Sequence, residues 1–264
     1  MLNAIRKGRE IMPPLKIVLY GVAGIGKTTF GGTFESPILL PIEDGIGKLD
    51  VNHFPVATNY QAVEDAMSAL YENEHPYRTL IIDSLDWLEP LVWETTCQAN
   101  EKPSIESFGY GKGYIEADKW WRRLMGGLDA LRAHKGMHIV LLAHSEIKNI
   151  APPDSDTYDR WQLRLHRRAF NLWKDWSEIL LFLNYRISIK KEDKGFNDRT
   201  RAIGTGDRII YTAERPAFDA KNRWSLPYEI FIGKDETFAA FHSALETATE
   251  GKYVAPKKEG EKKA

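Results

Sequence analysis

The residues from Gly21 to Thr28, GVAGIGKT, have the types and spacing needed to bind phosphate. They match the pattern G-x-x-x-x-G-K-[ST] at every fixed position, and we call them the phosphate loop. Glycines let consecutive backbone N–H groups approach phosphate oxygens, which a Cβ would obstruct. Lys27 is expected to reach the β- and γ-phosphates, and the Thr28 hydroxyl is expected to ligate Mg²⁺. The sequence therefore predicts a site for ATP and Mg²⁺. Its predicted nucleotide contacts are Gly21, Val22, Ala23, Gly24, Ile25, Gly26, Lys27, Thr28 and Thr29.

Asp83 is the predicted acid on the magnesium side of this site. It follows four strand-forming residues, Thr79-Leu80-Ile81-Ile82. Phosphate loops of this kind work with an acid that holds the metal, commonly at the end of a neighbouring buried strand. Thr28 and Asp83 are therefore the expected metal residues. The alternative is that Asp83 caps the helix after it.

Two further polar residues follow apolar strands and are candidates for chemistry at the γ-phosphate. Glu43 comes after residues 37–42, and in a parallel sheet the carboxyl end of this strand opens on the same crevice as the phosphate loop. Glu43 is the candidate general base, with Asp44 as the alternative. His144 ends the run HIVLLA and could donate to the γ-phosphate and report its loss to the following loop. A satisfied polar residue at a strand end is the other interpretation of His144.

The elements that must position these residues form an alternating pattern. Short apolar runs alternate with helical stretches, which predicts an α/β fold with a mostly parallel sheet flanked by helices. Strands are expected at 16–20, 37–42, 79–83, 138–143 and 178–184, with a weaker one near 54–57. Helices are expected at 27–34, 60–71, 85–99, 115–134, 163–173 and 236–249. Residues 186–191 and 208–212 predict a C-terminal antiparallel hairpin on the sheet edge. Two long loops are expected at 101–114 and 145–162, and loops of this length are often functional.

Composition limits the class of protein. The chain has 264 residues, enough for one large α/β domain. Its formal charge of −1 excludes a uniformly basic coat for nucleic acid. Cys97 is the single cysteine, which excludes an intrachain disulfide and a cysteine zinc cluster. No apolar run has the length of a signal peptide or of a membrane span, so a cytoplasmic protein without membrane contact is expected. The expected divisions are an N-terminal extension (1–14), an ATPase domain (15–250) and a disordered Lys-rich tail (251–264).

The order of these parts, from the phosphate loop through Glu43 and Asp83 to His144, resembles the core of RecA-like P-loop ATPases. More narrowly, the chain is similar to the compact RecA-like ATPases often encoded by bacteriophages, whose best-known members are single-strand annealing recombination proteins. The resemblance runs from about Lys16 to Ile232. ILLPIEDGIGKLD (38–50) is similar to the segment that bears the catalytic glutamate in RecA. FGYGKGY (108–114) and AKNRWSLP (220–227) look like features of the phage group.

The resemblance also implies catalytic cations and an assembly. In RecA-like assemblies, cations near the position of Lys221 and Arg223 reach the γ-phosphate of the neighbouring subunit. Supplied in trans, such cations stabilise the charge of the transition state. The implied assembly is a homo-oligomer, a ring or short filament, with ATP at subunit interfaces. A solvated charged turn is the alternative for Lys221 and Arg223.

The two long loops and the helix predicted after the second one combine cations with aromatic rings, which is the composition that binds single-stranded DNA. In RecA-like proteins, loops in the corresponding places hold DNA. Asp154, Asp156 and Asp159 dilute the positive charge of the second loop, and amphipathic helices often carry similar Arg/Trp stretches. The candidate DNA contacts are Tyr110, Lys112, Tyr114, Trp161, Arg164, Arg167 and Arg168.

The resemblance therefore implies an ATP-hydrolysing RecA-like protein that acts on single-stranded DNA in recombination or annealing. A single-strand-binding protein is a further expected partner, and the cytoplasm of a bacterial host is the expected location. Three alternatives stay open. They are a motor or loader ATPase for a replicative helicase, a kinase for nucleoside monophosphates, and a nucleotide switch that does not hydrolyse ATP.

Overall fold

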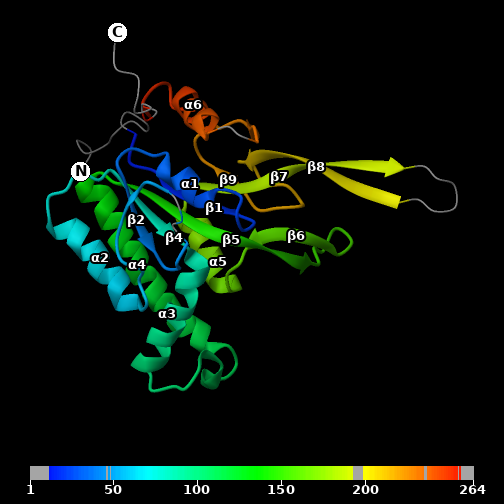
Figure 1. Ribbon diagram of the computed structural model, residues 1–264. Coiled ribbons are helices and arrows are strands. Elements are labelled where there is room, and N and C mark those ends of the chain that lie inside the picture. The colour runs from blue at the N-terminus through cyan, green and yellow to red at the C-terminus, as the bar shows by residue number, and fades with distance from the viewer. Residues whose placement is uncertain are drawn as a thin grey trace, which may run out of the picture.

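The centre of the molecule is a sheet whose strands lie in the order β10–β8–β7–β1–β5–β4–β2–β3 (Figure 1). The computed structural model describes residues 12–45, 47, 49–192, 199–234, 237–254 and 256. The strands from β7 to β3 pair in parallel, and β8 and β10 continue the sheet in antiparallel pairing. This confirms the predicted fold class: an α/β protein with a mostly parallel sheet and an antiparallel edge, as in P-loop NTPases. The strands are β1 (Lys16–Gly21), β2 (Pro37–Pro41), β3 (Asn52–His53), β4 (Thr79–Asp83), β5 (His138–Ile150), β6 (Tyr158–Leu163), β7 (Ile179–Glu192), β8 (Arg199–Tyr211), β9 (Lys221–Asn222) and β10 (Glu229–Ile232).

Helices cover both faces of the sheet because its inner strands are apolar on both sides. On β1, Val18 and Tyr20 belong to the core shared with α2, α3, α4 and α5, whereas Ile17 and Leu19 belong to the core shared with α1 and α6. Strands buried on both faces are typical of parallel sheets. The helices are α1 (Lys27–Gly32), α2 (Tyr60–Glu72), α3 (Leu85–Ala99), the 3₁₀ helix η2 (Ile105–Phe108), α4 (Lys112–Lys135), α5 (Arg167–Trp176) and α6 (Ala239–Ala248).

The predicted loop at 145–162 is wrong, because most of this segment is a β-hairpin. β5 continues past His144 to Ile150, and β6 pairs with it in antiparallel register from Ser145↔Leu163 to Ile150↔Tyr158. Pro152 and Pro153 lie in the turn between the strands. The prolines and acids of this turn made the whole segment look like a loop. The helix predicted to begin at 163 begins at Arg167, because Leu163 still belongs to β6.

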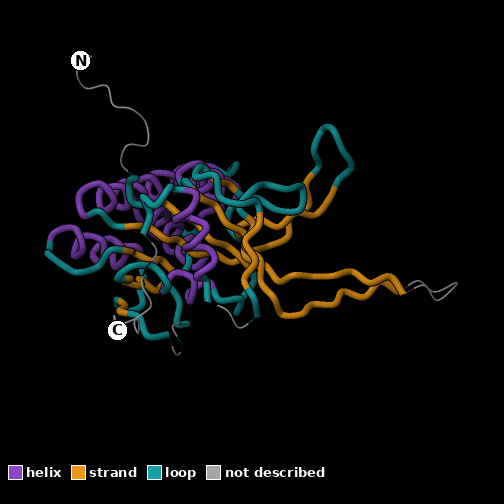
Figure 2. The backbone as a smooth tube through the Cα atoms, turned by 90° about the horizontal axis from the view of Figure 1, so that it is seen from above, coloured by secondary structure: helices purple, strands orange, loops and turns teal. Residues whose placement is uncertain are grey.

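The predicted C-terminal hairpin is confirmed and forms a second arm. β7 continues from the sheet and pairs with β8 as far as Glu192↔Arg199. Figure 2 shows that both hairpins extend from the same side of the molecule. The β7–β8 and β5–β6 hairpins both prolong strands at their carboxyl ends, which is the end where the phosphate loop follows β1.

Other boundaries differ locally from the expectations. The weak strand predicted near 54–57 is wrong, since the strand is Asn52–His53, although the Phe54 and Ala57 amides still donate to carbonyl groups of β2. The loop predicted at 101–114 contains η2 and the start of α4. The helix predicted at 236–249 is Ala239–Ala248, and residues 235 and 236 lie outside the described residues. Most of the predicted extension (1–14) and tail (251–264) also lies outside them.

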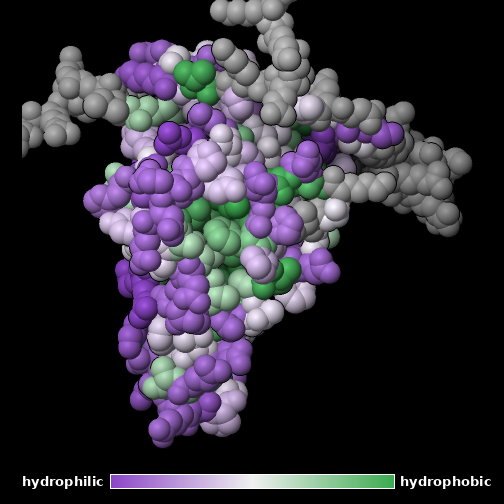
Figure 3. Space-filling model, turned by 60° about the vertical axis from the view of Figure 1, so that its left-hand side comes forward, coloured by the Kyte–Doolittle hydropathy of each residue, from purple (hydrophilic) through white to green (hydrophobic). Residues whose placement is uncertain are grey.

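The surface is mostly hydrophilic on the face shown in Figure 3, with one hydrophobic area surrounded by polar side chains. Exposed large hydrophobic residues come from several elements, among them Trp87 on α3, Ile147 on β5 and Phe231 on β10. Single exposed apolar side chains of this kind are ordinary. Within the described residues, none of the helices combines the length and the apolar character needed to cross a bilayer.

Two histidines, the buried His242 on α6 and the partly buried His138 at the start of β5, predict a loss of stability in acid. His242 is 4% exposed and contacts Thr33 Oγ1 (2.8 Å) and the Tyr253 hydroxyl (2.6 Å), while His138 Nδ1 accepts from the Leu15 amide (2.9 Å). Burial lowers the pKa of each ring to about 4, from an ordinary value of 6.5. The unfolded chain therefore binds more protons than the folded protein below pH 6.5, and stability falls as the pH falls from 6.5 towards 4.

For His242 alone the shift corresponds to a loss of roughly 3 kcal/mol across this window. Urea unfolding at pH 7.5 and pH 4.5 should reveal it as a pH-dependent change in the free energy of unfolding. His242→Gln, which cannot titrate, should show a smaller change between the two pH values than the wild type. Equal changes in the two proteins would remove His242 as a source of acid sensitivity.

Candidate nucleotide site

The phosphate loop joins β1 to α1, and its glycines are required by the local geometry. A Cβ on residue 21 would lie 2.3 Å from the carbonyl oxygen of Leu183 on the neighbouring β7. Gly24 and Gly26 have φ angles of 73° and 105°, in the region that favours glycine. Lys27, only 6% exposed, donates from Nζ to the carbonyl oxygens of Gly21 (3.2 Å) and Val22 (3.1 Å). Burial lowers the pKa of Lys27, and nearby Asp83 opposes this shift.

Thr28 and Asp83 lie together as expected for two residues around one metal ion. The Thr28 hydroxyl donates to Asp83 Oδ2 over 2.6 Å. Asp83 ends β4. The expected position was a strand next to β1, but β5 lies between β1 and β4. The alternative role of Asp83 as a helix cap is not supported, since Ser84 occupies the N-cap position of α3. Burial raises the pKa of Asp83, and the hydrogen bond from Thr28 and the charge of Lys27 oppose the rise.

This donor set fits Mg²⁺. A hydroxyl and a carboxylate are hard oxygen ligands, and Mg²⁺ is commonly held by one or two protein groups together with substrate phosphates and water. Among the described residues no group of three His, Cys, Asp or Glu side chains could hold a metal ion without such help. Thr28 and Asp83 would therefore hold the ion jointly with the nucleotide.

A cavity of about 550 Å³ opens beside these residues and has the size of a small-ligand site. Its lining includes Lys27, Thr28, Asp83, Glu43 and His144. Gly24, Gly26 and Thr29 of the predicted nucleotide contacts also line it, whereas Gly21, Val22, Ala23 and Ile25 do not. Asp44, the alternative base, is exposed and is not part of this lining, which favours Glu43.

Glu43 has the environment of a general base. Its Oε1 accepts a hydrogen bond from Ser84 Oγ (3.3 Å), which links it to the residue that follows Asp83. Burial raises the pKa of Glu43, and the neighbouring carboxylates of Asp83 and Asp86 add to the rise, whereas His144 opposes it. A carboxylate with a raised pKa is a better proton acceptor near neutral pH.

Asp86 is a residue of this site that the sequence analysis missed. It lies in the first turn of α3, three residues after Asp83, and its side chain is 1% exposed. The His144 amide donates to its Oδ1 (2.9 Å), His144 Nδ1 contacts its Oδ2 (3.0 Å), and the Arg164 Nε donates to Oδ2 (3.1 Å). Burial alone would raise the pKa of Asp86, but these hydrogen bonds hold it well below its usual range. The only sequence signal was a second acid placed one helical turn after Asp83.

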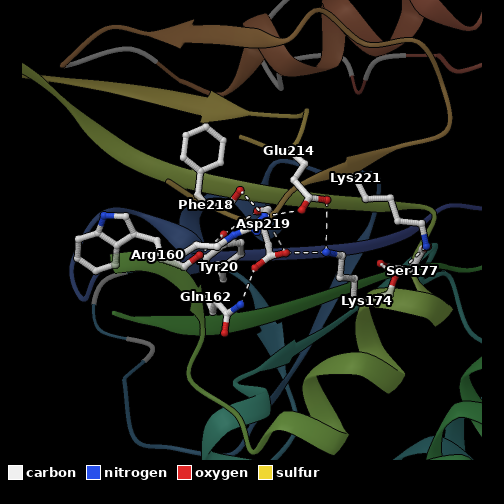
Figure 4. A network of polar contacts seen from close by, with 10 residues as sticks. Tyr20, Arg160, Gln162, Lys174, Ser177, Glu214, Phe218, Asp219 and Lys221 are labelled. Atoms are coloured by element: carbon white, nitrogen blue, oxygen red, sulfur yellow. Dashed lines mark hydrogen bonds and ion pairs between the residues drawn. The ribbon is translucent and has the colours of Figure 1, made fainter. Parts of the chain in front are cut away.

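The contacts of Lys221 within its own chain do not support the prediction that it acts as a catalytic cation in trans. Its Nζ donates to three carbonyl oxygens at the C-terminal end of α5, those of Lys174 (2.7 Å), Asp175 (3.1 Å) and Ser177 (2.7 Å). A lysine at this position satisfies carbonyl groups that the helix leaves without partners. Figure 4 shows the Lys221 side chain directed towards Ser177. Lys221 is therefore explained by a contact within its own subunit.

The chain before Lys221 is also fixed within its own subunit (Figure 4). Asp219, 2% exposed, accepts from Lys174 Nζ (2.6 Å) on α5 and from Gln162 Nε2 (2.9 Å) on β6. Its carbonyl oxygen accepts from the Tyr20 hydroxyl (2.6 Å), one residue before the phosphate loop. This network ties the hairpin and α5 to the buried carboxylate of Asp219, and the strand of the phosphate loop to its backbone carbonyl.

Arg223 differs from Lys221. Its side chain is exposed, and within the described part of the chain it has neither an ion pair nor a side-chain hydrogen bond. It follows β9, which pairs with Ile179 and Leu180 at the start of β7, whereas the phosphate loop lies near Leu183. Arg223 is therefore at the other end of the strand from its own nucleotide site, and its role in trans stays a prediction.

The candidate DNA residues divide into two groups. The rings of Tyr114 and His166 stack with centroids 3.8 Å apart, and Arg168 pairs with Asp118 (2.5 Å), so the N-terminal ends of α4 and α5 lie side by side. Exposed side chains in this area, which we call the α4/α5 patch, are those of Tyr110, Lys112, Arg167 and Arg168. Trp161 and Arg164 lie outside the patch. Trp161 is partly buried beside Phe182, with ring centroids 5.9 Å apart, and Arg164 is bound to Asp86.

Comparison with known proteins finds a family model that covers most of the chain. A family model described as an AAA domain matches residues 13–224. The matched range contains the phosphate loop, Glu43, Asp83, Asp86 and His144. No curated protein matches the chain.

Proposed function

The chain belongs to the family of AAA domains, and from this premise we propose that it is a Mg²⁺-dependent ATPase that acts on single-stranded DNA in recombination or annealing. Membership of the family indicates a nucleotide-binding ATPase. The observation that carries the proposal is the 2.6 Å contact between Thr28 and Asp83 in a cavity that Lys27 and Glu43 also line. A hydroxyl, a carboxylate, an ammonium and a base around one cavity form the set that phosphoryl transfer to water requires.

Each residue has a role in the proposed reaction. Backbone amides of the phosphate loop and the Lys27 ammonium bind the phosphate oxygens, and Thr28 and Asp83 hold the metal ion. Mg²⁺, when bound, neutralises charge on the β- and γ-phosphate oxygens. Glu43 accepts a proton from the attacking water as its oxygen bonds to the γ-phosphorus. The bond from the γ-phosphorus to the bridging oxygen breaks, and ADP and phosphate are the products.

The α4/α5 patch supports the proposed action on DNA. Tyr110 is fully exposed, and the described residues provide no hydrogen bond or ion pair to the side chains of Tyr110, Lys112 or Arg167. Aromatic faces stack on bases and cations bind phosphates, without preference for sequence. The patch also lies at two helix N-termini, where the helix dipoles favour anions. Both termini are at the carboxyl end of the parallel strands, the same end as the nucleotide cavity.

ATP hydrolysis measured with and without single-stranded DNA tests this function. We expect DNA to stimulate hydrolysis and the double variant Lys112→Ala/Arg167→Ala to bind DNA more weakly. Loss of two phosphate contacts should reduce the slope of log affinity against log salt by about 1.4, at roughly 0.7 for each contact with a single strand. Lys135→Ala, at the other end of α4, should leave the slope unchanged. No DNA binding would contradict the proposed action on DNA, and an unchanged slope in the double variant would exclude this patch.

The proposed assembly depends on Arg223. Its exposed guanidinium, far from its own cavity, is suited to reach the γ-phosphate of a neighbouring subunit, where an arginine stabilises the transition state. We propose a homo-oligomer, a ring or short filament, with nucleotide at the subunit interfaces. Turnover per subunit would then rise with protein concentration.

A further inference from the structure

The carboxylate of Asp86 joins the nucleotide cavity to the base of the β5–β6 hairpin. Among the described residues, each of its hydrogen bonds involves one of two residues, His144 and Arg164, which face each other where the hairpin leaves the sheet. The Arg164 amide donates to the His144 carbonyl (2.9 Å), and the next pair of the hairpin is Ser145↔Leu163. His144 is also the register partner of Gly21, the first residue of the phosphate loop. The buried carboxylate of Asp86 therefore binds His144, which lines the nucleotide cavity and lies where the hairpin begins.

The contacts of Asp86 determine which ring nitrogen of His144 carries the proton. An ionised carboxylate can only accept hydrogen bonds, so His144 Nδ1, at 3.0 Å from Oδ2, must be the donor. The His144 amide, which donates to Oδ1, prevents the ring from turning away without losing a second bond. In a neutral ring with Nδ1 protonated, Nε2 is an acceptor. The neutral ring would then accept a proton or a hydrogen bond at Nε2, in contrast to the donor role expected from the sequence.

We propose that Asp86 is a positioning residue that fixes His144 as the Nδ1–H tautomer, with Nε2 available as a hydrogen-bond acceptor in the nucleotide cavity. The proposal rests on the proposed ATPase function, because the group that Nε2 accepts from is the attacking water. Glu43 and His144 line the same cavity, so the two acceptors can orient both hydrogens of one water molecule. Asp86 acts on the reaction only through His144.

Arg164 extends this role to the hairpin. Its guanidinium is bound to Asp86 Oδ2 and its side chain is about half exposed, so the ion pair joins a half-exposed cation to a buried acid. Because Arg164 directly follows β6, this ion pair fixes the returning strand of the hairpin to the same carboxylate that orients His144. A displacement of His144 by nucleotide would therefore act on the hairpin through Asp86.

Long-range ¹H–¹⁵N correlation spectra of the full chain test the tautomer directly. The His144 ring signals are assigned by their loss in His144→Gln. The wild type should show Nδ1–H and a bare Nε2. Asp86→Asn should shift the ring towards the Nε2–H tautomer, because an amide that keeps its oxygen on the His144 N–H presents its nitrogen, which cannot accept, to Nδ1. An Nε2–H ring in the wild type would overturn the proposal even if Asp86→Asn does not fold, and so would an unchanged tautomer in a folded Asp86→Asn.

Steady-state kinetics provide a second readout. Asp86→Asn should lower kcat by about 10-fold to 100-fold and leave KM for ATP within about threefold, because only the orientation of water is lost. The matched control is Glu178→Gln, which removes another partly buried carboxylate paired with an arginine, Arg132, at the start of β7. This control should keep kcat. A normal kcat in Asp86→Asn would overturn the proposal.

The hairpin contact is tested by Arg164→Ala, which leaves the carboxylate in place. Because bonded and non-bonded pairs alternate from the Arg164–His144 bond onward, the next bonded pair is Glu146↔Gln162. We expect faster hydrogen exchange of the Glu146 and Gln162 amides with an unchanged His144 tautomer, and unchanged exchange would remove Arg164 from the proposal. Failure of the proposed function is distinguishable from all these results. A wild type without ATP hydrolysis would contradict the ATPase function, whereas the spectra would still decide whether Asp86 sets the tautomer.

Discussion

Lys27→Ala should reduce ATP turnover by at least about 100-fold, the scale of losing one preorganised electrostatic contact to the reacting group. The Lys27 ammonium is the cation of the phosphate loop, and it lies beside Asp83 in a largely buried position. Without this ammonium, the negative charge that develops on the γ-phosphate during the reaction is no longer neutralised by the lysine of the phosphate loop. Titration with Mg·ATP should show weaker binding as well, because the ammonium also contacts the ground state.

A lysine on the strand that leads into the phosphate loop provides the control for Lys27→Ala. Lys16, at the beginning of β1, is also largely buried and pairs with Asp129 (2.5 Å), but it lies at the end of the sheet away from the cavity. Lys16→Ala should reduce stability and leave nucleotide affinity unchanged. Equal losses of affinity in the two variants would indicate a general effect on folding and would contradict a specific role for Lys27.

Glu43→Gln should abolish most hydrolysis while preserving nucleotide binding. The amide keeps the size of the side chain and can still accept from Ser84 Oγ, but it cannot take a proton from water. General bases contribute about 100-fold to 10,000-fold, so kcat should fall within that range. Comparing kcat with the dissociation constant for Mg·ATP separates the two effects.

Asp44→Asn is the matched control for Glu43→Gln. It changes the neighbouring acid, which lies outside the cavity lining, and should leave kcat near the wild-type value. If Glu43→Gln retained near-normal turnover, Glu43 would not be the base. A large loss in Asp44→Asn with little loss in Glu43→Gln would reverse the assignment.

The nucleotide site could be predicted from sequence because each of its main parts is encoded locally. The phosphate loop is one continuous motif, and Glu43, Asp83 and His144 each end an apolar run whose direction in a parallel sheet places them together. These strands all end at the same edge of the sheet, so the site residues come together even where their strands are not neighbours. Asp83 therefore meets Thr28 even though β5 lies between their strands.

Asp86 and Lys221 could not be assigned because their contacts depend on distant parts of the chain. Asp86 is 58 residues from His144 and 78 from Arg164, and only the folded sheet brings the three side chains together. Lys221 resembles a free cation in the sequence, but its carbonyl partners lie 44 to 47 residues earlier, at the end of α5. A local pattern cannot distinguish a helix-capping lysine from one that reaches another subunit.

The β5–β6 hairpin was missed for a different reason. Its strands carry a mixture of charged and apolar residues, since neither face of the hairpin is as deeply buried as the central strands. The apolar pattern that identifies a core strand is therefore weak here, and the prolines of the turn favour the prediction of a loop. The antiparallel pairing of β5 with β6 is a property of the folded backbone and has no strong local sequence pattern.

The most direct test of the account is calorimetric titration of the full chain with ATP, in the presence and absence of Mg²⁺. We expect one nucleotide bound per chain, with clearly weaker binding when Mg²⁺ is withheld, because Thr28 and Asp83 then lack the ion that they share with the phosphates. Absence of any binding of Mg·ATP to the folded protein would contradict the central claim.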